Sequence, residues 1–304
     1  MTGTAKAAYT RIRKHLPRRL VERLELSVFS PAELMDRLDL LRAEHSGPRF
    51  LPSHRRIVID ITTACDLRCI DCNRSCGEGQ AVANEHLSVA QVGRFVEESV
   101  ACGRKWDQIA IEGGEPTLHP QLADVVSVLV AYRNRHSPRT HIQLLTNGYA
   151  KAPHPSLESF RRQNVLVRST RKTAQRQQRH CSFNVAPCDS PELCGVDCSQ
   201  GCVLPACYGL GLTRHGYYPH PICGGIDRVF GFDIGRKRLP PRGDGMSEHF
   251  AQLCRLCGFL RHSLLERGQT QRQAAGGGVT PRISETWQRG YARYRERAPE
   301  LTLY

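Results

Sequence analysis

Hydrophobic and polar positions between residues 56 and 186 follow two alternating periods. Short runs rich in β-branched residues predict strands over 56–61, 108–112, 141–146, 165–168 and 182–186. Between them, apolar residues recur at helical spacing and predict helices that start at Ser88, cover 122–130 and cover 156–162. Strands alternating with helices are typical of βαβ units. We therefore expect an α/β fold, with a parallel sheet that forms an open sheet or a full or partial barrel.

The helix at Ser88 has a defined start, because Gln91 follows three residues later and completes a capping box. Its apolar face is predicted to pack on the sheet through Val89, Val92, Val96 and Val100. The next helix is predicted to face inward through Leu122, Val125, Val126, Leu129 and Val130. Residues 56–186 are thus expected to form the core domain.

The chain before residue 56 is predicted to be a basic helical leader, 1–55, in which Ser30 and Glu33 form another capping box. It carries no candidate catalytic or metal-binding residues.

After the core, residues 187–262 are dense in Cys, Gly and Pro and are predicted to form a small separate module. It is expected to contain a hairpin that turns at His215 and Gly216, and a helix from Ser247 to about residue 260. Residues 263–304 are predicted to be a glycine-containing linker and a terminal helix. That helix is expected to dock through Trp287, Tyr291 and Tyr294.

The composition is that of a soluble globular protein, since 40% of the 304 residues are hydrophobic and 24% are charged. It excludes collagen-like, coiled-coil and fully disordered classes. No stretch approaches the roughly 18 uncharged apolar residues of a membrane span. The basic N-terminal residues are not followed by an apolar segment or a cleavage site, so no secretory signal is expected and a cytoplasmic location is predicted.

The 14 cysteines need an explanation other than disulfides in that reducing compartment. Metal or redox chemistry is the leading hypothesis. The formal net charge of +14 suggests a nucleic acid or acidic partner, or only an arginine-rich composition with a solvated surface.

Three of the cysteines follow the first predicted strand with the spacing C-x3-C-x2-C, at Cys65, Cys69 and Cys72. Three thiolates in one loop suit three irons of a cubane cluster and leave the fourth iron open to a ligand. Cys76 would complete a closed four-thiolate zinc or iron–sulfur site as the alternative.

A second motif, Gly113-Gly114-Glu115-Pro116, follows the second predicted strand. Paired glycines let the backbone approach a ligand closely, and the carboxylate of Glu115 is an acceptor for an ammonium group. Taken alone, the same residues would serve as a turn.

The two motifs, in this order and at successive strand ends, resemble the radical SAM superfamily over about residues 56–186. The resemblance implies a partial (β/α)6 TIM-type barrel and a [4Fe-4S] cluster on Cys65, Cys69 and Cys72, whose open iron chelates S-adenosylmethionine (SAM). It also implies that the Gly113–Pro116 motif holds the methionine amino group. Two features depart from the family: Asp71 stands where an aromatic residue is common, and no Gly-x-Ile-x-Gly-x-x-Glu segment is found.

The same resemblance suggests further SAM contacts from residues that end the third and fourth predicted strands. These residues are Thr146, Asn147, Gly148 and Ser169. An ordinary strand-end turn is the alternative for each of them.

Cysteines after the core resemble the SPASM and twitch extensions of radical SAM enzymes, in which a cysteine, a hairpin, a cysteine and a C-x2-C pair bind an auxiliary cluster. A single twitch-like [4Fe-4S] cluster is expected on Cys207, Cys223, Cys254 and Cys257. Cys202 and His220 are alternative ligands, and zinc is the alternative metal. The roles of Cys76, Cys181, Cys188, Cys194 and Cys198 stay open.

The resemblance implies an enzyme that cleaves SAM reductively to a 5′-deoxyadenosyl radical, which abstracts hydrogen from a substrate. A peptide in natural-product maturation is the expected substrate, with oxidation, crosslinking or epimerisation as the outcome. A small molecule, a sugar or tRNA is the alternative. Expected partners are the substrate and a reductase such as flavodoxin or ferredoxin, with no membrane. The hypothesis from another class is a non-catalytic iron–sulfur electron-transfer or metal-binding protein, which would need no SAM site.

Overall fold

The computed structural model describes residues 51–69, 72–77, 84–149, 154–176, 183–189, 197–199, 202, 204–260 and 283–304. The expectations for the leader up to residue 50, for Asp71, for Cys181 and Cys194 and for the glycine-containing linker lie outside this part of the chain.

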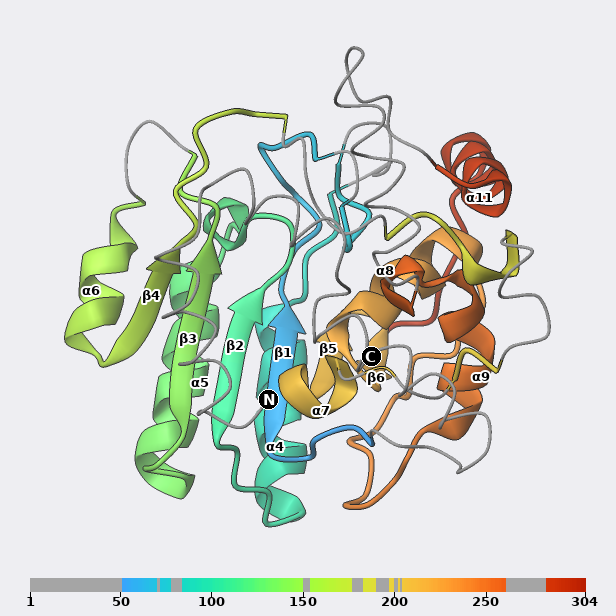
Figure 1. Ribbon diagram of the computed structural model, residues 1–304. Helices are drawn as coiled ribbons and strands as arrows, with labels where there is room; N and C mark the ends of the chain where they lie inside the picture. Colours follow the sequence, from blue (N-terminus) through green and yellow to red (C-terminus); the bar gives the residue numbers. More distant parts are fainter. Residues whose placement is uncertain are drawn as a thin grey trace, which may run out of the picture.

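The centre of the molecule is a six-stranded sheet in the order β4-β3-β2-β1-β5-β6 (Figure 1). Its strands are β1 (Arg56–Asp60), β2 (Gln108–Glu112), β3 (His141–Thr146), β4 (Val165–Ser169), β5 (Leu210–Thr213) and β6 (Gly216–Tyr218). Strands β1 to β5 pair in parallel, and β6 pairs antiparallel to β5. The α/β class with a partial TIM-type sheet is confirmed.

The fifth and sixth strands differ from a sequential barrel. The strand predicted over 182–186 is wrong, because Phe183, Asn184 and Val185 form a turn and bend. The fifth strand instead belongs to the hairpin predicted for the C-terminal module, and it pairs with β1. The sheet therefore crosses the predicted domain boundary at residue 187, and the division into domains stays a prediction.

Two helices cover one face of the sheet, α4 (Val89–Ala101) and α5 (Leu122–His136), and both lie behind it in Figure 1. The capping box at the start of α4 is present, since the Gln91 amide donates to Ser88 Oγ and the Ser88 amide donates to Gln91 Oε1. The buried face of α4 is rotated from the predicted one. It is centred on Val92, Phe95 and Ser99, while Val100 is exposed.

The predicted inward residues of α5 are all buried, and they share one core with alternate residues of β1, β2 and β5. The short helix α6 (Ser156–Arg162) leads into β4 as predicted. Because side chains alternate between the two faces of a strand, the other face of β1 and β5 needs a different cover.

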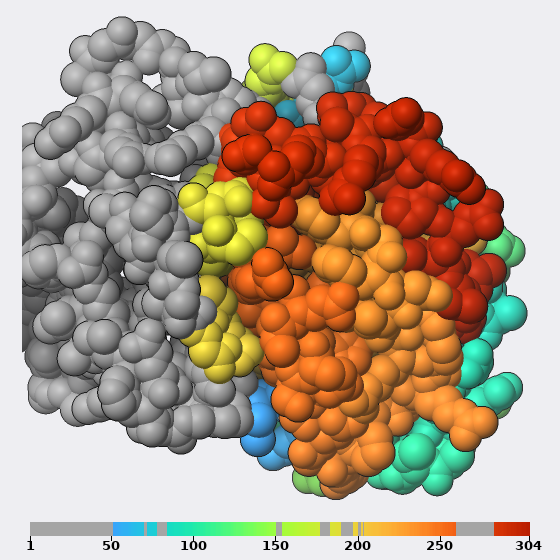
Figure 2. Space-filling model, turned by 90° about the vertical axis from the view of Figure 1, so that its right-hand side faces the viewer, coloured from blue at the N-terminus to red at the C-terminus, as the bar shows by residue number. Residues whose placement is uncertain are grey.

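That cover is α8 (Pro221–Phe230), which packs against β5 and β1. A Cβ at Gly211 would lie 2.6 Å from the Cα of Pro221, so the helix start and the strand touch through backbone. The terminal helix α11 (Glu285–Glu296) then packs on α8 through Trp287, Tyr291 and Tyr294, as its aromatic spacing predicts. Figure 2 shows the segment of α11, in red, lying across the surface formed by residues 204–260, in orange.

Two further helices flank the hairpin and α8. They are α7 (Leu204–Tyr208), before β5, and α9 (Ser247–Leu253), which is followed by single 3-10 turns at Cys254–Leu256 and Gly258–Leu260. Within the described residues, no helix is long and apolar enough to cross a bilayer.

His220 immediately precedes α8 and is 2% exposed. Burial, together with the nearby charge of Arg74, lowers its pKa from 6.5 to about 3. The folded protein thus keeps this imidazole neutral at a pH where the unfolded chain protonates it.

We expect folding stability to fall as the pH drops from about 6.5 towards about 3, by about 1.4 kcal/mol per pH unit for this one group. Urea unfolding between about pH 7 and about pH 5 will show a steeper loss in the wild type than in His220→Gln. Equal slopes for both proteins would mean that His220 is protonated in the folded state.

Candidate functional site

The predicted site residues gather at the carboxyl edge of the sheet. The cysteine loop follows β1, the Gly113–Pro116 motif follows β2, Thr146 ends β3 and Ser169 ends β4. Parallel strands place these ends side by side, which is why motifs far apart in sequence meet here.

The two glycines of the second motif press against the start of the cysteine loop. Gly113 has a φ of +139°, and a Cβ there would lie 2.3 Å from the carbonyl oxygen of Thr62. A Cβ at Gly114 would lie 2.3 Å from the carbonyl oxygen of Ala64. The amides of Gly114 and Glu115 donate to these carbonyls, each at 2.7 Å. Larger residues would push the two loops apart.

Glu115 holds the ends of β2 and β3 together. Its carboxylate is 1% exposed and accepts hydrogen bonds from Thr146 Oγ1 (2.7 Å), the Asn147 amide (2.7 Å) and both the amide and hydroxyl of Thr117. Both carboxylate oxygens are therefore engaged within the protein. The half-buried Gly113 and Gly114 carry the part of the motif that remains accessible.

Asn147 extends this connection to the cysteine loop, because its Nδ2 donates to Asp66 Oδ1 at 2.6 Å. Ser169 is exposed and lies beside Gly148, where an added Cβ would be 2.0 Å from the serine Oγ. The structure thus brings all the predicted SAM-contacting residues to one edge, around the loop that carries the cysteines.

The thiols of the first motif shift one another's pKa values through electrostatic interactions and hydrogen bonds. Burial, with the charges of Cys72, Asp66 and Cys69, raises the pKa of Cys65 to about 12. Hydrogen bonds from Cys76 outweigh burial and lower the pKa of Cys72 to about 6. The Cys76 amide lies 3.4 Å from Cys72 Sγ.

These thiols fit an iron–sulfur cluster by donor chemistry and by their shared loop. Among the described residues, no three His, Cys, Asp or Glu side chains lie close enough together to hold a metal ion.

Arg74, two residues after the third cysteine, fastens this loop to the sheet. Its guanidinium lies 2.7 Å from Asp60 Oδ2 and 2.9 Å from Glu112 Oε2, and all three side chains are nearly buried. Burial opposes the charge on Arg74, yet the two carboxylates outweigh it and raise the arginine pKa. Burial raises the pKa of both carboxyls, and the charge of Arg74 offsets only part of that rise.

Helix α8 holds the same loop from the other side. Arg228 Nη2 donates to the carbonyl oxygens of Arg74 (2.6 Å) and Ser75 (3.0 Å), and Nη1 donates to the Tyr294 hydroxyl. The Ser75 hydroxyl lies 3.2 Å from the hydroxyl of Tyr291 in α11. Sequence reasoning missed Arg74 and Arg228. The only local signal was an acidic residue, Asp60 or Glu112, at the end of each of two strands with an apolar centre.

A second group of cysteines lies around the start of α8 and the end of α9. Cys198, Cys202 and Cys254 pack together, and Cys223 and Cys257 belong to the adjoining core. Burial, followed by the charges of the other four thiols, raises the pKa of Cys254 well above its ordinary value. Burial likewise raises the pKa of Cys198 to about 11.

Cys207, which was predicted with this group, is exposed and lies at the other end of β1, where its carbonyl oxygen accepts from Arg56 Nη1 at 2.9 Å. The structure brings Cys223, Cys254 and Cys257 together and places Cys198 and Cys202 beside them. His220 is the other alternative ligand. Its backbone carbonyl oxygen accepts a hydrogen bond from the Cys223 amide at 3.2 Å.

No protein-family model matches the chain. GTP 3′,8-cyclases from two strains of Corynebacterium glutamicum are 33% identical to it over 101 residues, which is 33% of this chain and 26% of each relative. The chain thus matches about a quarter of these relatives' length.

The crystal structure of BtrN in complex with AdoMet and 2-DOIA superposes on 69% of this chain and 94% of its own, with 13% identity and a TM-score of 0.37. That superposition is too loose to establish a common fold.

The two motifs nevertheless stand at successive ends of parallel strands and touch through backbone that only glycine permits. This arrangement, together with the similarity to the GTP 3′,8-cyclases over a third of the chain, supports the resemblance to the radical SAM superfamily.

Proposed function

We propose that the protein is a radical SAM enzyme whose cluster is held by Cys65, Cys69 and Cys72. The observation that carries the proposal is the direct contact of the Gly113–Pro116 motif with the cysteine loop, through the 2.7 Å bonds to Thr62 and Ala64. An electron carrier would need the cysteines but not this second loop. When bound, the cluster and SAM supply a 5′-deoxyadenosyl radical, and the protein selects which hydrogen is removed.

The residues around the loop would position SAM rather than react with it. Glu115 fixes Thr146 and Asn147, and Asn147 is tied to Asp66 between the first two cysteines. The accessible backbone of Gly113 and Gly114 would receive the methionine end of SAM, with Ser169 at the neighbouring strand end. Such a rigid frame suits a reaction that depends on positioning and on excluding water.

We propose further that the second cysteine group holds an auxiliary iron–sulfur cluster through Cys202, Cys223, Cys254 and Cys257, with Cys198 beside them. Buried thiols with raised pKa values stay protonated without a metal, and a bound cation makes thiolates of them. This set replaces Cys207 of the twitch-like expectation by Cys202. Zinc is the alternative metal.

The substrate class and the electron donor are also proposals. A peptide substrate follows from the SPASM-like and twitch-like resemblance, and a small molecule, a sugar or tRNA is the alternative. A flavodoxin-like or ferredoxin-like reductase is the proposed electron donor, in the cytoplasm where such clusters stay reduced.

The reaction is tested by anaerobic reconstitution with iron and sulfide, reduction with dithionite and addition of SAM. We expect 5′-deoxyadenosine from the wild type, and none from a variant with Cys65, Cys69 and Cys72 all changed to Ala. The variant should keep about four of about eight irons. Wild-type protein that carries iron but neither binds nor cleaves SAM would favour the electron-transfer alternative.

The auxiliary ligands are tested in the background of that triple variant, where only the second group can hold iron. Cys254→Ala and Cys202→Ala are expected to lose most of the remaining iron, because each removes a buried ligand. The matched control Cys207→Ala removes an exposed thiol and should keep it. Loss of iron in Cys207→Ala, with retention in Cys202→Ala, would restore the ligand set expected from sequence.

The ion pairs of Arg74 with Asp60 and Glu112 are expected to support both the fold and the first cluster site. Arg74→Met leaves two buried carboxyls without their cation and should destabilise the fold by about 3–5 kcal/mol. It should also reduce iron at the first site while the second site keeps its iron, as read from iron content and electron paramagnetic resonance of each cluster.

Arg74→Lys is expected to restore only part of the iron, since an ammonium cannot span both carboxylates as a guanidinium does. The control Arg55→Met breaks an exposed ion pair with Asp107 and should leave the iron content unchanged. Full iron in Arg74→Met would show that the loop is held without this contact.

A further inference from the structure

Two open cavities lie at the amino edge of the sheet, where the strands of Figure 1 begin. One has a volume of about 770 Å³ and the other of about 730 Å³. Because Asp107, Pro138 and Arg139 line both of them, they form one continuous hollow, here called the amino-edge groove. Arg56 begins β1 and lines this groove, whereas the cysteine loop follows the other end of that strand. The groove is thus separate from the proposed SAM site.

Positive charge is in excess along the amino-edge groove. Its lining, within the described part of the chain, has one carboxylate, Asp107, and six basic side chains, which are Arg55, Arg56, Lys105, Arg133, Arg139 and Arg242. Asp107 lies 2.8 Å from Arg55 in an ion pair that is largely exposed. The other five cations face no acidic side chain of the described lining.

Hydrogen bonds hold two of these guanidiniums in place without cancelling their charge. Arg56 Nη1 donates to the carbonyl oxygen of Cys207 at 2.9 Å. Arg133 donates to the carbonyl oxygens of Gln163 at 2.7 Å and Asn164 at 3.0 Å. A carbonyl oxygen accepts a hydrogen bond but carries no net charge. Both side chains are therefore positioned at the groove and keep their full positive charge.

The positive charge also acts on neighbouring titratable groups. Burial, and then the charge of Arg242, lower the pKa of the buried Arg104. Burial, with the charges of Arg104 and Arg242, outweighs a hydrogen bond to Asp244 and lowers the pKa of His54, which lines the groove. Nearby cations contribute to both shifts, as a positive potential does. Such a potential attracts an anionic partner.

The lining favours the phosphates of a nucleic acid over an acidic protein. Five of its six described cations are arginines, whose planar guanidinium can pair with two phosphate oxygens at once. The centre of a protein interface is usually apolar and rich in aromatic residues. Among the described lining residues, Leu166 is the one exposed large hydrophobic side chain, and Trp106 is only 1% exposed. The groove thus offers charge without the apolar surface that a protein partner needs.

We propose that the amino-edge groove binds the phosphate backbone of a single-stranded nucleic acid, chiefly through Arg56, Arg139 and Arg242. Single strands bind in positively charged grooves that follow their backbone. Binding here is independent of base sequence, since the described lining has no exposed aromatic ring of Phe, Tyr or Trp on which bases could stack. The proposal goes beyond the function proposed above, because the groove lies at the opposite end of the strands from the cysteine loop.

Fluorescence anisotropy of the reconstituted 304-residue chain tests this binding. SAM is left out, so the result does not depend on the radical reaction. The probe is fluorescein-labelled oligouridine of about 20 nucleotides. We expect a Kd of roughly 1–100 µM at about 100 mM salt, and a plot of log K against log salt with a slope of about −2 to −4, as for about three to five neutralised phosphates. Oligocytidine should bind about as tightly.

Two triple variants separate the groove from the general positive charge of the surface. The groove variant removes three exposed cations together, by Arg56→Gln, Arg139→Gln and Arg242→Gln. The matched control removes the same charge from exposed positions on β4 and α11, by Arg168→Gln, Arg289→Gln and Arg293→Gln. The groove variant should weaken oligouridine binding at least about tenfold and reduce the salt slope by about 2, whereas the control should weaken binding less than about threefold.

A second measurement uses the wild type alone. Phenylglyoxal modifies accessible arginines, and mass spectrometry identifies the modified residues. Bound oligouridine should protect Arg56 and Arg139 from modification and leave Arg168 unprotected. If the groove variant loses its circular dichroism signal for folded protein, this protection pattern decides.

Three results would overturn the proposal. The first is wild-type protein that does not bind oligouridine even at about 50 mM salt. The second is equal loss of binding in both triple variants, or equal protection of Arg168 and Arg139, which would make the positive charge a solvated surface with no defined site. The third is tighter binding of oligoglutamate or of an RNA duplex of the same length, which would assign the groove to an acidic protein or to a double strand.

Discussion

One guanidinium determines where the cysteine loop sits. Arg74 is placed just beyond the third cysteine, and it bridges the carboxylates that end β1 and β2. Two buried acids share this guanidinium, which favours a loop position with the arginine between the strands. Because Asp60 and Glu112 are partners in the β1–β2 register, the sheet itself sets the spacing of that bridge. Gly114, Glu115 and Asn147 in turn hydrogen-bond to residues at the start of this loop.

Helix α8 carries that constraint across the molecule to the second cysteine group. Arg228, near its end, holds the backbone of Arg74 and Ser75, and Cys223, near its start, lies among the other thiols. Between them, a Cβ on Gly225 would come within 3.2 Å of the Arg74 backbone. A glycine in a helix costs about 1 kcal/mol relative to alanine, and here it permits the close approach of helix and loop. One short helix thus contacts both cysteine groups.

Local patterns in the sequence predicted the parts of the structure that depend on neighbours along the chain. The strands β1 to β4, the cap at Ser88 and the aromatic face of α11 follow from periodicity and spacing. The meeting of both motifs was also predictable, because parallel strands place their ends together. What the sequence could not show are contacts chosen by tertiary packing: the carboxylate of Glu115 bonds within the protein, and Cys202 rather than Cys207 lies in the second thiol group.

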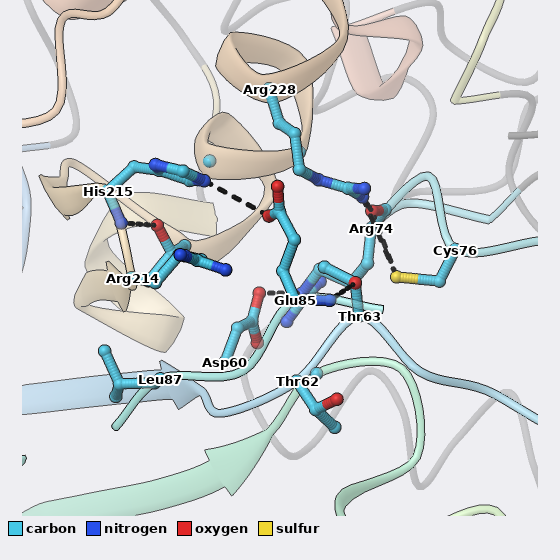
Figure 3. Close-up of a pocket in the computed structure, with 14 residues that line it drawn as sticks. Asp60, Thr62, Thr63, Arg74, Cys76, Glu85, Leu87, Arg214, His215 and Arg228 are labelled. Carbon is cyan, nitrogen blue, oxygen red and sulfur yellow. Dashed lines mark hydrogen bonds and ion pairs between the residues drawn. The ribbon is translucent and has the colours of Figure 1, made fainter. Parts of the chain in front are cut away.

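The position of β5 is the departure with the greatest consequence. In a sequential barrel the fifth strand would follow β4, at the far side of the sheet from β1. Here β5 pairs with β1, and its turn therefore brings Arg214 and His215 to the carboxyl edge beside Gly113. The hairpin, α8 and the cysteine loop all contribute residues to a small cavity at this edge (Figure 3). This part of the carboxyl edge is thus built by a hairpin that the linear pattern had assigned to a separate module.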